Sequence, residues 1–180
     1  LTEYEKAKIY YNKAYQKMSE AYGAENLKTL SINENIANIY NLQGYFAQSI
    51  VIFEKNLEIK TLKLGKNHPD VAELHNNLGN AYYESGNTEM AGKHYEAALA
   101  IRNIQGYSQK GKLDGLYNNL GLYYKSSGNY SKSLDYFALS VELKRELYKT
   151  DNIQIANVLN NIGTIYEKLG YFDNAMAYFD

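Results

Sequence analysis

The stretch NNLGNAYYESGNT, residues 76–88, contains a pattern that recurs along the chain. It places two asparagines ahead of an apolar series that runs to Gly86. Asparagine is roughly 0.5 kcal/mol worse than alanine inside a helix, so a pair of them at this point needs a reason. The same pattern occurs at intervals of 42 residues, in ENIANIYNLQGYF (34–46), NNLGLYYKSSGNY (118–130) and NNIGTIYEKLGYF (160–172). Four copies in register define an internal repeat.

Each copy has the features of a first helix that ends at a glycine. Gly44, Gly86, Gly128 and Gly170 keep the 42-residue spacing. A glycine at this point fits a left-handed helix cap, because without a Cβ atom it adopts positive φ at no steric cost. A second segment with helical periodicity follows, such as TEMAGKHYEAALAIR at 88–102. The repeat therefore predicts one helical hairpin per unit.

Small and aromatic residues recur within these hairpins. The small residues fall where the two backbones of a hairpin can approach closely, at Ala37, Gly79, Gly121 and Gly163 in the first helix and at Ser49, Ala91, Ser133 and Ala175 in the second. The recurring aromatic residues are Tyr40, Tyr82, Tyr124 and Tyr166, followed by Phe53, Tyr95, Phe137 and Phe179. Because most of the 20 tyrosines follow this period, we interpret them first as core residues.

The amino-acid composition indicates a folded chain whose net charge does not favour highly charged partners. Of its 180 residues 45% are hydrophobic, and the net charge is -1. This balance disfavours nucleic acid and anionic membranes as partners. The absence of cysteine excludes disulfides and thiolate chemistry. No apolar run approaches the roughly 20 residues of a membrane span. We expect a cytoplasmic location, and a lost signal stays open because residue 1 is Leu.

The pattern L-G-x-x-Y, followed by Gly four residues on and by a small and an aromatic residue in the second helix, resembles the tetratricopeptide repeat. The 42-residue length is similar to that of kinesin light chain repeats, and residues 66–87, with His68-Pro69-Asp70 at the helix entry, look much like such a unit. The resemblance implies an all-α fold, a right-handed α–α superhelix or solenoid of helical hairpins. It also implies a protein-interaction scaffold, although the fold alone does not specify the function.

The 42-residue interval also predicts the domain organisation. Ala7 and Tyr11 lie 42 residues before Ser49 and Phe53, so the first segment matches a second helix without its first. The predicted parts are an orphan helix at 1–28 and repeats at 29–70, 71–112, 113–154 and 155–180, the last of them truncated. Because both ends cut a unit, we expect a longer parent protein. The family's tryptophan-like position departs from the pattern and leaves the partner open; it holds Asn33, His75, Tyr117 and Leu159.

Helical geometry separates a buried arc of the first helix from a second stripe. In the second repeat the arc consists of Leu74, His75, Leu78, Gly79, Ala81 and Tyr82, which we expect to face the core. The stripe always contains an asparagine that core packing does not require, at Asn35, Asn77, Asn119 and Asn161. In the family this stripe lines the concave groove, and the ladder resembles those that hold an extended peptide. One carboxamide can pair with both the N–H and the C=O of a peptide unit.

The predicted peptide-binding residues are Asn35, Asn77, Asn119, Asn161, Asn38, Asn80, Asn157, Tyr83 and Lys125. We expect this groove to bind with little use of charge. A structural reading stays open, in which the amides bond within or between repeats and hold the helices in register. For the other doublet position we expect simple solvation, at Glu34, Asn76, Asn118 and Asn160.

Other site classes find no support in the sequence. The family's carboxylate clamp needs Lys or Arg at three slots, which here hold Glu34, Gly115 and Asn119, or Asn76, Asn157 and Asn161 one repeat later. His75 is interpreted as a packed imidazole, and the three histidines provide no metal cluster. No phosphate loop or catalytic motif occurs. We therefore predict no enzyme, no cofactor and no metal, with a protein or peptide as partner. The alternative is a regulatory or oligomerisation module that associates through its end faces.

Overall fold

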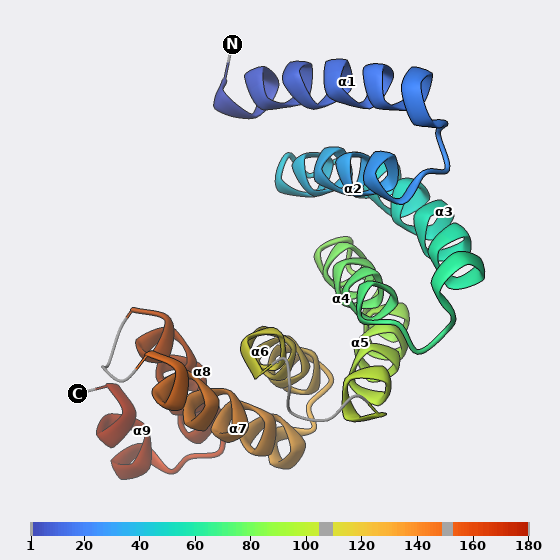
Figure 1. Cartoon of the computed structure of the whole chain (residues 1–180). Helices are drawn as coiled ribbons and strands as arrows, with labels where there is room; N and C mark the ends of the chain where they lie inside the picture. The colour runs from blue at the N-terminus through green and yellow to red at the C-terminus, as the bar shows by residue number, and fades with distance from the viewer. Residues whose placement is uncertain (1, 105–109, 149–152, 180) are drawn as a thin grey trace. The chain divides into compact units, whose positions relative to one another are not determined.

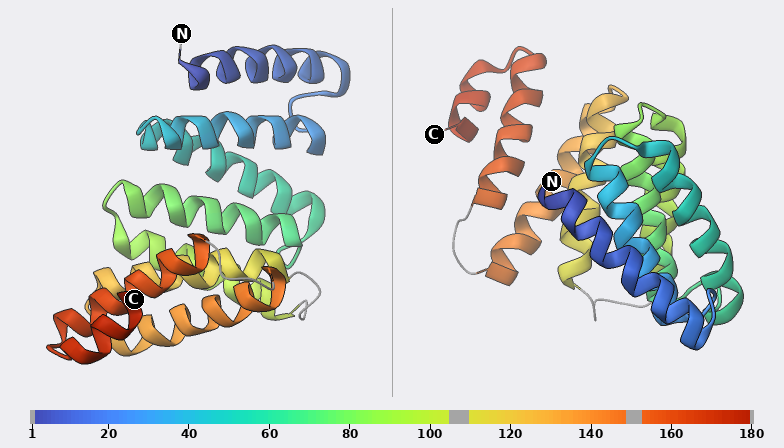
Figure 2. Two further views of the ribbon diagram at one scale, coloured as in Figure 1. Left: turned by 90° about the vertical axis from the view of Figure 1, so that its left-hand side faces the viewer. Right: turned by 90° about the horizontal axis from the view of Figure 1, so that it is seen from above.

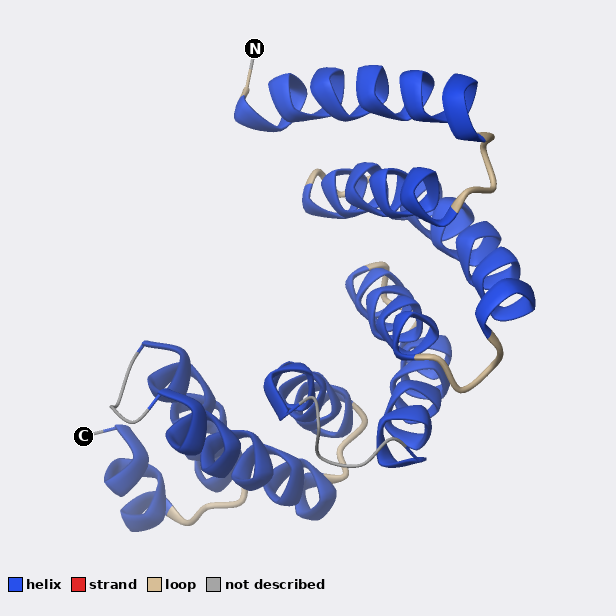
Figure 3. Ribbon diagram, viewed as in Figure 1, coloured by secondary structure: helices blue, strands red, loops and turns tan. Residues whose placement is uncertain are grey.

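The computed structural model describes residues 2–104, 110–148 and 153–179. Across these residues the regular structure consists of α-helices and includes no strand (Figure 1, Figure 3). The helices are α1 (Glu3–Tyr22), α2 (Leu27–Leu42), α3 (Phe46–Leu64), α4 (Pro69–Glu84), α5 (Thr88–Ile104), α6 (Lys110–Ser126), α7 (Tyr130–Tyr148), α8 (Ile153–Lys168) and α9 (Phe172–Phe179). The predicted all-α class and the helical hairpins are confirmed.

The chain divides into two compact units, Leu1–Ile101 and Arg102–Asp180, and each is described by itself. In the first unit α1 packs on α2, α2 on α3, and α3 on α4. In the second unit α6 packs on α7, α7 on α8, and α8 on α9, while α6 also contacts α8 (Figure 2). The boundary between the units falls inside the predicted repeat at 71–112, so the partition into repeats stays a prediction.

The recurring glycines end the first helices as predicted. Gly44, Gly86, Gly128 and Gly170 have φ values of 80°, 85°, 78° and 80°. The N–H of the next residue donates to a carbonyl five residues back, for example from Asn87 to Tyr82 at 2.9 Å and from Asn129 to Tyr124 at 2.9 Å. This bond defines a Schellman cap, which satisfies carbonyls that the helix leaves open. The same sequence signal therefore produces the same turn four times.

The predicted arc of the second repeat faces the core. Leu74, Leu78 and Ala81 are fully buried, whereas His75 and Tyr82 are half-buried. Leu74 and Leu78 of α4 lie in one apolar cluster with Phe53 of α3, so the first helix of one repeat covers the second helix of the repeat before it. In the second unit Phe137 of α7 packs in the same way with residues of α8, namely Ile155, Val158, Ile162 and Ile165.

The first-helix glycines lie directly under aromatic rings of the second helix. A Cβ atom built on Gly79 would come within 2.5 Å of the Tyr95 ring, and one on Gly121 would come within 2.5 Å of the Phe137 ring. Carbon atoms in contact need about 3.5 to 4.0 Å. The glycines thus admit the rings, and this allows the two helices to lie close together in the α4–α5 and α6–α7 hairpins. No helix in the described ranges is both long and apolar enough to cross a membrane.

Candidate functional site

The four asparagines of the predicted ladder lie on the first helices and keep contact with solvent. In the first unit Asn35 of α2 is exposed and Asn77 of α4 is half-buried. In the second unit Asn119 of α6 and Asn161 of α8 are both half-buried. None of the four is part of the buried core. Their placement is therefore compatible with contact to another molecule, and whether they bind a peptide stays a prediction.

Two of the predicted residues are brought together in the second unit. Lys125 Nζ, near the end of α6, donates a hydrogen bond to Asn161 Oδ1 of α8 at 2.6 Å. The two residues are 36 positions apart in the sequence, and each is half-buried. Burial lowers the pKa of Lys125, and repulsion by Lys168 lowers it further. Lys125, one of the predicted peptide-binding residues, thus places a positive charge beside the ladder asparagine Asn161 in a groove that was expected to use little charge.

The remaining predicted residues differ in whether they bond within the chain or face solvent. Asn80 Oδ1 accepts a hydrogen bond from the Tyr95 hydroxyl at 2.9 Å, so this amide also holds the α4–α5 hairpin. Asn38 and Asn157 are exposed, and Tyr83 is half-buried. Asn157 lines a hollow of about 620 Å³ that α8 forms with Tyr178 and Phe179 of α9. Asn80 therefore serves its own hairpin, whereas Asn38 and Asn157 face solvent.

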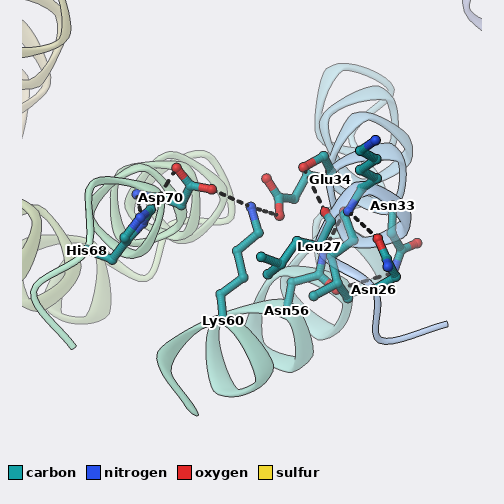
Figure 4. A network of polar contacts seen from close by, with 11 residues as sticks. Asn26, Leu27, Asn33, Glu34, Asn56, Lys60, His68 and Asp70 are labelled. Atoms are coloured by element: carbon teal, nitrogen blue, oxygen red, sulfur yellow. Dashed lines mark hydrogen bonds and ion pairs between the residues drawn. The ribbon is translucent and has the colours of Figure 1, made fainter. Parts of the chain in front are cut away.

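A buried lysine connects three helices of the first unit (Figure 4). Lys60 of α3 is 2% exposed. Its Nζ atom lies 2.7 Å from Glu34 Oε1 of α2 and 3.4 Å from Asp70 Oδ2 of α4. Burial raises the pKa of Glu34, and the Lys60 ammonium opposes this effect. The predicted solvation of Glu34 is wrong, because a cation from the neighbouring helix draws this carboxylate inward.

The amide of Asn56 completes the network in Figure 4. Asn56 Nδ2 donates to the carbonyl of Leu30 at 3.1 Å, and its Oδ1 accepts from Asn33 Nδ2 at 3.4 Å. In the second unit Ser140 occupies the equivalent position of α7. Its Oγ donates to the carbonyl of Asp114 at 3.0 Å. Asp114 lies at the repeat position of Leu30. Different side chains thus make the same bond between the two helices of a hairpin.

The second unit contains a lysine at the position of Lys60. Lys144 of α7 is 6% exposed, and its Nζ lies 2.9 Å from Asp114 Oδ2 of α6 and 3.4 Å from Gln154 Oε1 of α8. A buried charge is costly unless it is paired, so these contacts maintain the helix packing. Sequence reasoning missed both lysines. The signal was present, since Lys60, Arg102 and Lys144 recur at intervals of 42 residues.

A ring cluster fills the predicted tryptophan-like position. In the α4–α5 hairpin the His75 and His94 Nδ1 atoms are 3.0 Å apart, and Tyr82 stacks on His94 with ring centroids 5.4 Å apart. Burial lowers the pKa of His75 to about 4, with a smaller contribution from His94. Burial also lowers the pKa of His94, against the attraction of Glu54. The interpretation of His75 as a packed imidazole is confirmed.

Tyrosines form the corresponding cluster in the α6–α7 hairpin. Tyr136 stacks on Tyr124 with an interplanar angle of 2°, and the centroids of Tyr117 and Tyr136 are 6.1 Å apart. The packing at this position is therefore aromatic in both hairpins, whereas only the imidazoles of the α4–α5 hairpin can take up protons. In the described part of the chain no group of three or more His, Asp or Glu residues could hold a metal ion.

Comparisons with known proteins agree with this geometry. The sequence model of the tetratricopeptide repeat matches residues 28–104 and 113–180. The chain therefore belongs to the tetratricopeptide repeat family, and its fold is the helical repeat solenoid of that family. No curated protein sequence gives a match.

Several solved structures share the fold. The crystal structure of BtubC (BKLC) from P. vanneervenii has a TM-score of 0.80 at 22% identity, over 97% of this chain and 70% of that one. A Podosopora anserina putative kinesin light chain with nearly identical TPR-like repeats has a TM-score of 0.76 at 15% identity, over 97% and 83%. A variant of that protein has a TM-score of 0.78 at 15% identity, over 97% of this chain and 82% of that one. The predicted resemblance to kinesin light chain repeats is confirmed at the level of fold.

Proposed function

We propose that the chain is a non-catalytic scaffold whose first helices bind an extended peptide segment of a partner protein. Tetratricopeptide repeats in general mediate protein–protein interactions, and that coarser role follows from the family. The specific proposal is that the asparagine ladder, Asn35, Asn77, Asn119 and Asn161, binds the peptide backbone. The observation that carries it is that these amides recur every 42 residues yet all stay outside the buried core.

The energetics of the ladder are consistent with a modest, additive interaction. Each amide can accept from a peptide N–H and donate to a peptide C=O. A hydrogen bond of this kind contributes about 0.5 to 1.5 kcal/mol net. Several in succession could hold an extended segment in register, while the side chains between them select the sequence. The exposed Asn38 and Asn157 extend the amide surface on α2 and α8.

The test is a peptide-array screen with the full chain, followed by affinity measurements with the double variant Asn77→Ala and Asn119→Ala. Losing one bond at each position should weaken binding by about 1 to 3 kcal/mol, which is roughly 5- to 150-fold. The matched control exchanges the neighbouring asparagines, Asn76→Ala and Asn118→Ala. Unchanged affinity in the first variant, or an equal loss in both, would contradict the ladder.

A further inference from the structure

The histidine pair of the α4–α5 hairpin brings two nitrogen donors together. His75 of α4 and His94 of α5 are both half-buried, and their Nδ1 atoms are 3.0 Å apart. Two bare nitrogen lone pairs repel at this distance, so one Nδ1 carries a proton and donates it to the other. The accepting ring then carries its own proton on Nε2. The pair thus holds one proton at a point where a nitrogen from each helix converges.

The separation of the two nitrogens matches that of neighbouring ligands on a transition metal. A metal such as zinc lies about 2.0 to 2.1 Å from a histidine nitrogen. Two ligands at this distance are about 2.9 Å apart at a right angle, as in tetragonal Cu²⁺ sites, and about 3.3 Å apart at the tetrahedral angle of Zn²⁺. The observed 3.0 Å lies between these values. Rotation of the rings would therefore aim both lone pairs at one cation without any separation of the two helices.

The groups around the pair favour a cation. Burial lowers the pKa of both imidazoles, so the rings are neutral near pH 7, and the neutral imidazole is the form that binds metal. The Glu54 carboxylate of α3 attracts positive charge at His94. The Tyr82 ring stacks on His94, and its hydroxyl donates to Glu54 Oε1 at 2.6 Å. Tyr82 thus holds a carboxylate near the two nitrogens, as an outer partner that orients and balances a metal site.

Packing of the hairpins does not require two imidazoles at these positions. The other hairpins fill the equivalent space with side chains that offer no nitrogen lone pair. The pairs there are Asn33 with Ile52, Tyr117 with Tyr136, and Leu159 with Tyr178. The stacked tyrosines of the α6–α7 hairpin show that rings without nitrogen fit as well. The nitrogen donors are therefore a feature of the α4–α5 hairpin, beyond what the repeat needs to fold.

We propose that His75 and His94 form a two-nitrogen site for one divalent transition-metal cation, Cu²⁺ in preference to Zn²⁺, with water in the remaining positions. The shared proton moves through water from Nδ1 to Nε2 of its own ring, and both Nδ1 lone pairs then bind the cation. Neither imidazole loses its neutral charge in this exchange. The bound cation connects α4 with α5 and stabilises the folded hairpin, because the unfolded chain does not hold the two rings together.

The test is calorimetric titration of the full chain, prepared without a histidine tag, with CuSO₄, ZnCl₂ and MgCl₂ at pH 7. One Cu²⁺ should bind per chain, and Zn²⁺ should bind about tenfold or more weakly, as the general order of metal affinities expects. Mg²⁺ should not bind, because it prefers oxygen ligands. The electron paramagnetic resonance spectrum of the Cu²⁺ complex should show two nitrogen ligands, and Cu²⁺ should raise the midpoint of thermal unfolding.

Two variants remove the donors in different ways. His75→Tyr with His94→Tyr introduces the pair found at Tyr117 and Tyr136 and should abolish Cu²⁺ binding. His75→Gln leaves one imidazole and should weaken binding and reduce the spectrum to one nitrogen ligand. The matched control is His68→Asn, because asparagine also serves as a helix cap and His68 caps α4 through its contact with the N–H of Asp70. This control should bind Cu²⁺ as the parent does.

The outcomes decide the site independently of the asparagine ladder. Parent chain that binds no Cu²⁺, or a complex with a single nitrogen ligand, overturns the proposal. Binding that persists in the double tyrosine variant assigns the metal to other donors, such as the terminal amine, and also overturns it. Circular dichroism of the metal-free variants reports whether each is folded. If the double variant is not folded, the spectrum of the His75→Gln complex decides, and two nitrogen ligands there overturn the site.

Discussion

Lys60 in the first unit and Lys144 in the second occupy the same position of the repeat, 84 residues apart, and both are buried. Their surroundings differ. Lys60 lies between two carboxylates, Glu34 and Asp70, whereas Lys144 pairs with one carboxylate, Asp114, and a neutral amide. The repeat thus determines where the cation lies but leaves the choice of counter-ion to each unit. Removing one carboxylate beside the lysine should therefore have unequal effects in the two units.

The hairpins differ in a second, independent way. The α4–α5 hairpin contains the His75–His94 pair, and the α6–α7 hairpin contains the Tyr117–Tyr136 pair at the same positions. Both pairs fill the same space between two helices. Only the imidazoles change charge in mildly acidic solution, because phenols stay neutral there. The comparison therefore separates packing, which the units share, from electrostatics, which they do not.

The largest difference should appear when Lys144 loses its carboxylate. Asp114→Ala leaves a buried ammonium with only the Gln154 amide, and breaking a buried pair in this way costs about 3 to 5 kcal/mol. We expect faster hydrogen exchange throughout α6 and α7 and a lower midpoint of chemical denaturation. The double variant Asp114→Leu with Lys144→Met should recover most of the loss, since apolar replacement of a whole pair is often neutral. A single variant as stable as the parent would show that Lys144 does not depend on Asp114.

An added methyl group should distinguish the α2–α3 hairpin from the α6–α7 hairpin where the two helices of each approach closely. The α2–α3 hairpin has Ala37 next to Phe53, whereas the α6–α7 hairpin has Gly121, where a Cβ would come within 2.5 Å of the Phe137 ring. Gly121→Ala should lower the free energy of unfolding by up to about 2 kcal/mol, because an overpacking cost of about 1 to 3 kcal/mol opposes a gain of about 1 kcal/mol in helix propensity. Denaturation midpoints measure the difference.

Gly115 provides the matched control on the same helix. A Cβ on Gly115 meets no atom within 4 Å, so Gly115→Ala should stabilise α6 by up to about 1 kcal/mol. The two substitutions are chemically identical and differ only in what the new methyl contacts. If both stabilise α6, the Phe137 ring moves aside without cost and the close approach does not fix the hairpin.

Mild acid should weaken the α4–α5 hairpin. The pKa of His75 is lowered from 6.5 to about 4, so the folded state binds fewer protons than the unfolded state between these values. Stability is therefore fully present above about pH 6.5 and is lost as the pH falls toward 4. The loss in the free energy of unfolding is at most about 3 kcal/mol from this pKa shift. Because the histidine pair is only half-buried, screening by solvent reduces the expected loss to about 1 to 2 kcal/mol. Hydrogen exchange of α4 amides at pH 7 and pH 4.5 measures the effect.

The control for this pH dependence takes its residues from the other unit. His75→Tyr with His94→Tyr introduces the pair found at Tyr117 and Tyr136. This variant should lose the dependence between pH 6.5 and 4 while it retains the stacked rings. The raised pKa of Glu34 acts in the opposite direction, because that carboxyl favours folding when it is protonated. A dependence that persists in the double variant would assign it to groups other than the histidines.

The sequence predicted the features that depend on local chemistry and on the repeat period. The glycine caps, the buried arc with Leu74 and Leu78, and the packed His75 follow from backbone sterics and helical spacing. The buried Lys60 was missed because its partners lie on α2 and α4, which only the folded packing brings near. The contact of Lys125 with Asn161 was missed for the same reason, since it joins residues of two repeats.

The smallest effect should come from removing the more exposed of the two carboxylates beside Lys60 in the first unit. Asp70→Ala leaves Lys60 paired with Glu34 at 2.7 Å, and the lost contact is longer, 3.4 Å, to a side chain that is 47% exposed. The free energy of unfolding should fall by at most about 1 kcal/mol, which is the contribution of an exposed ion pair. Chemical denaturation compares it with Asp114→Ala. Equal losses in the two units would mean that the second carboxylate is as necessary as the first, and that the unequal surroundings of Lys60 and Lys144 do not affect stability.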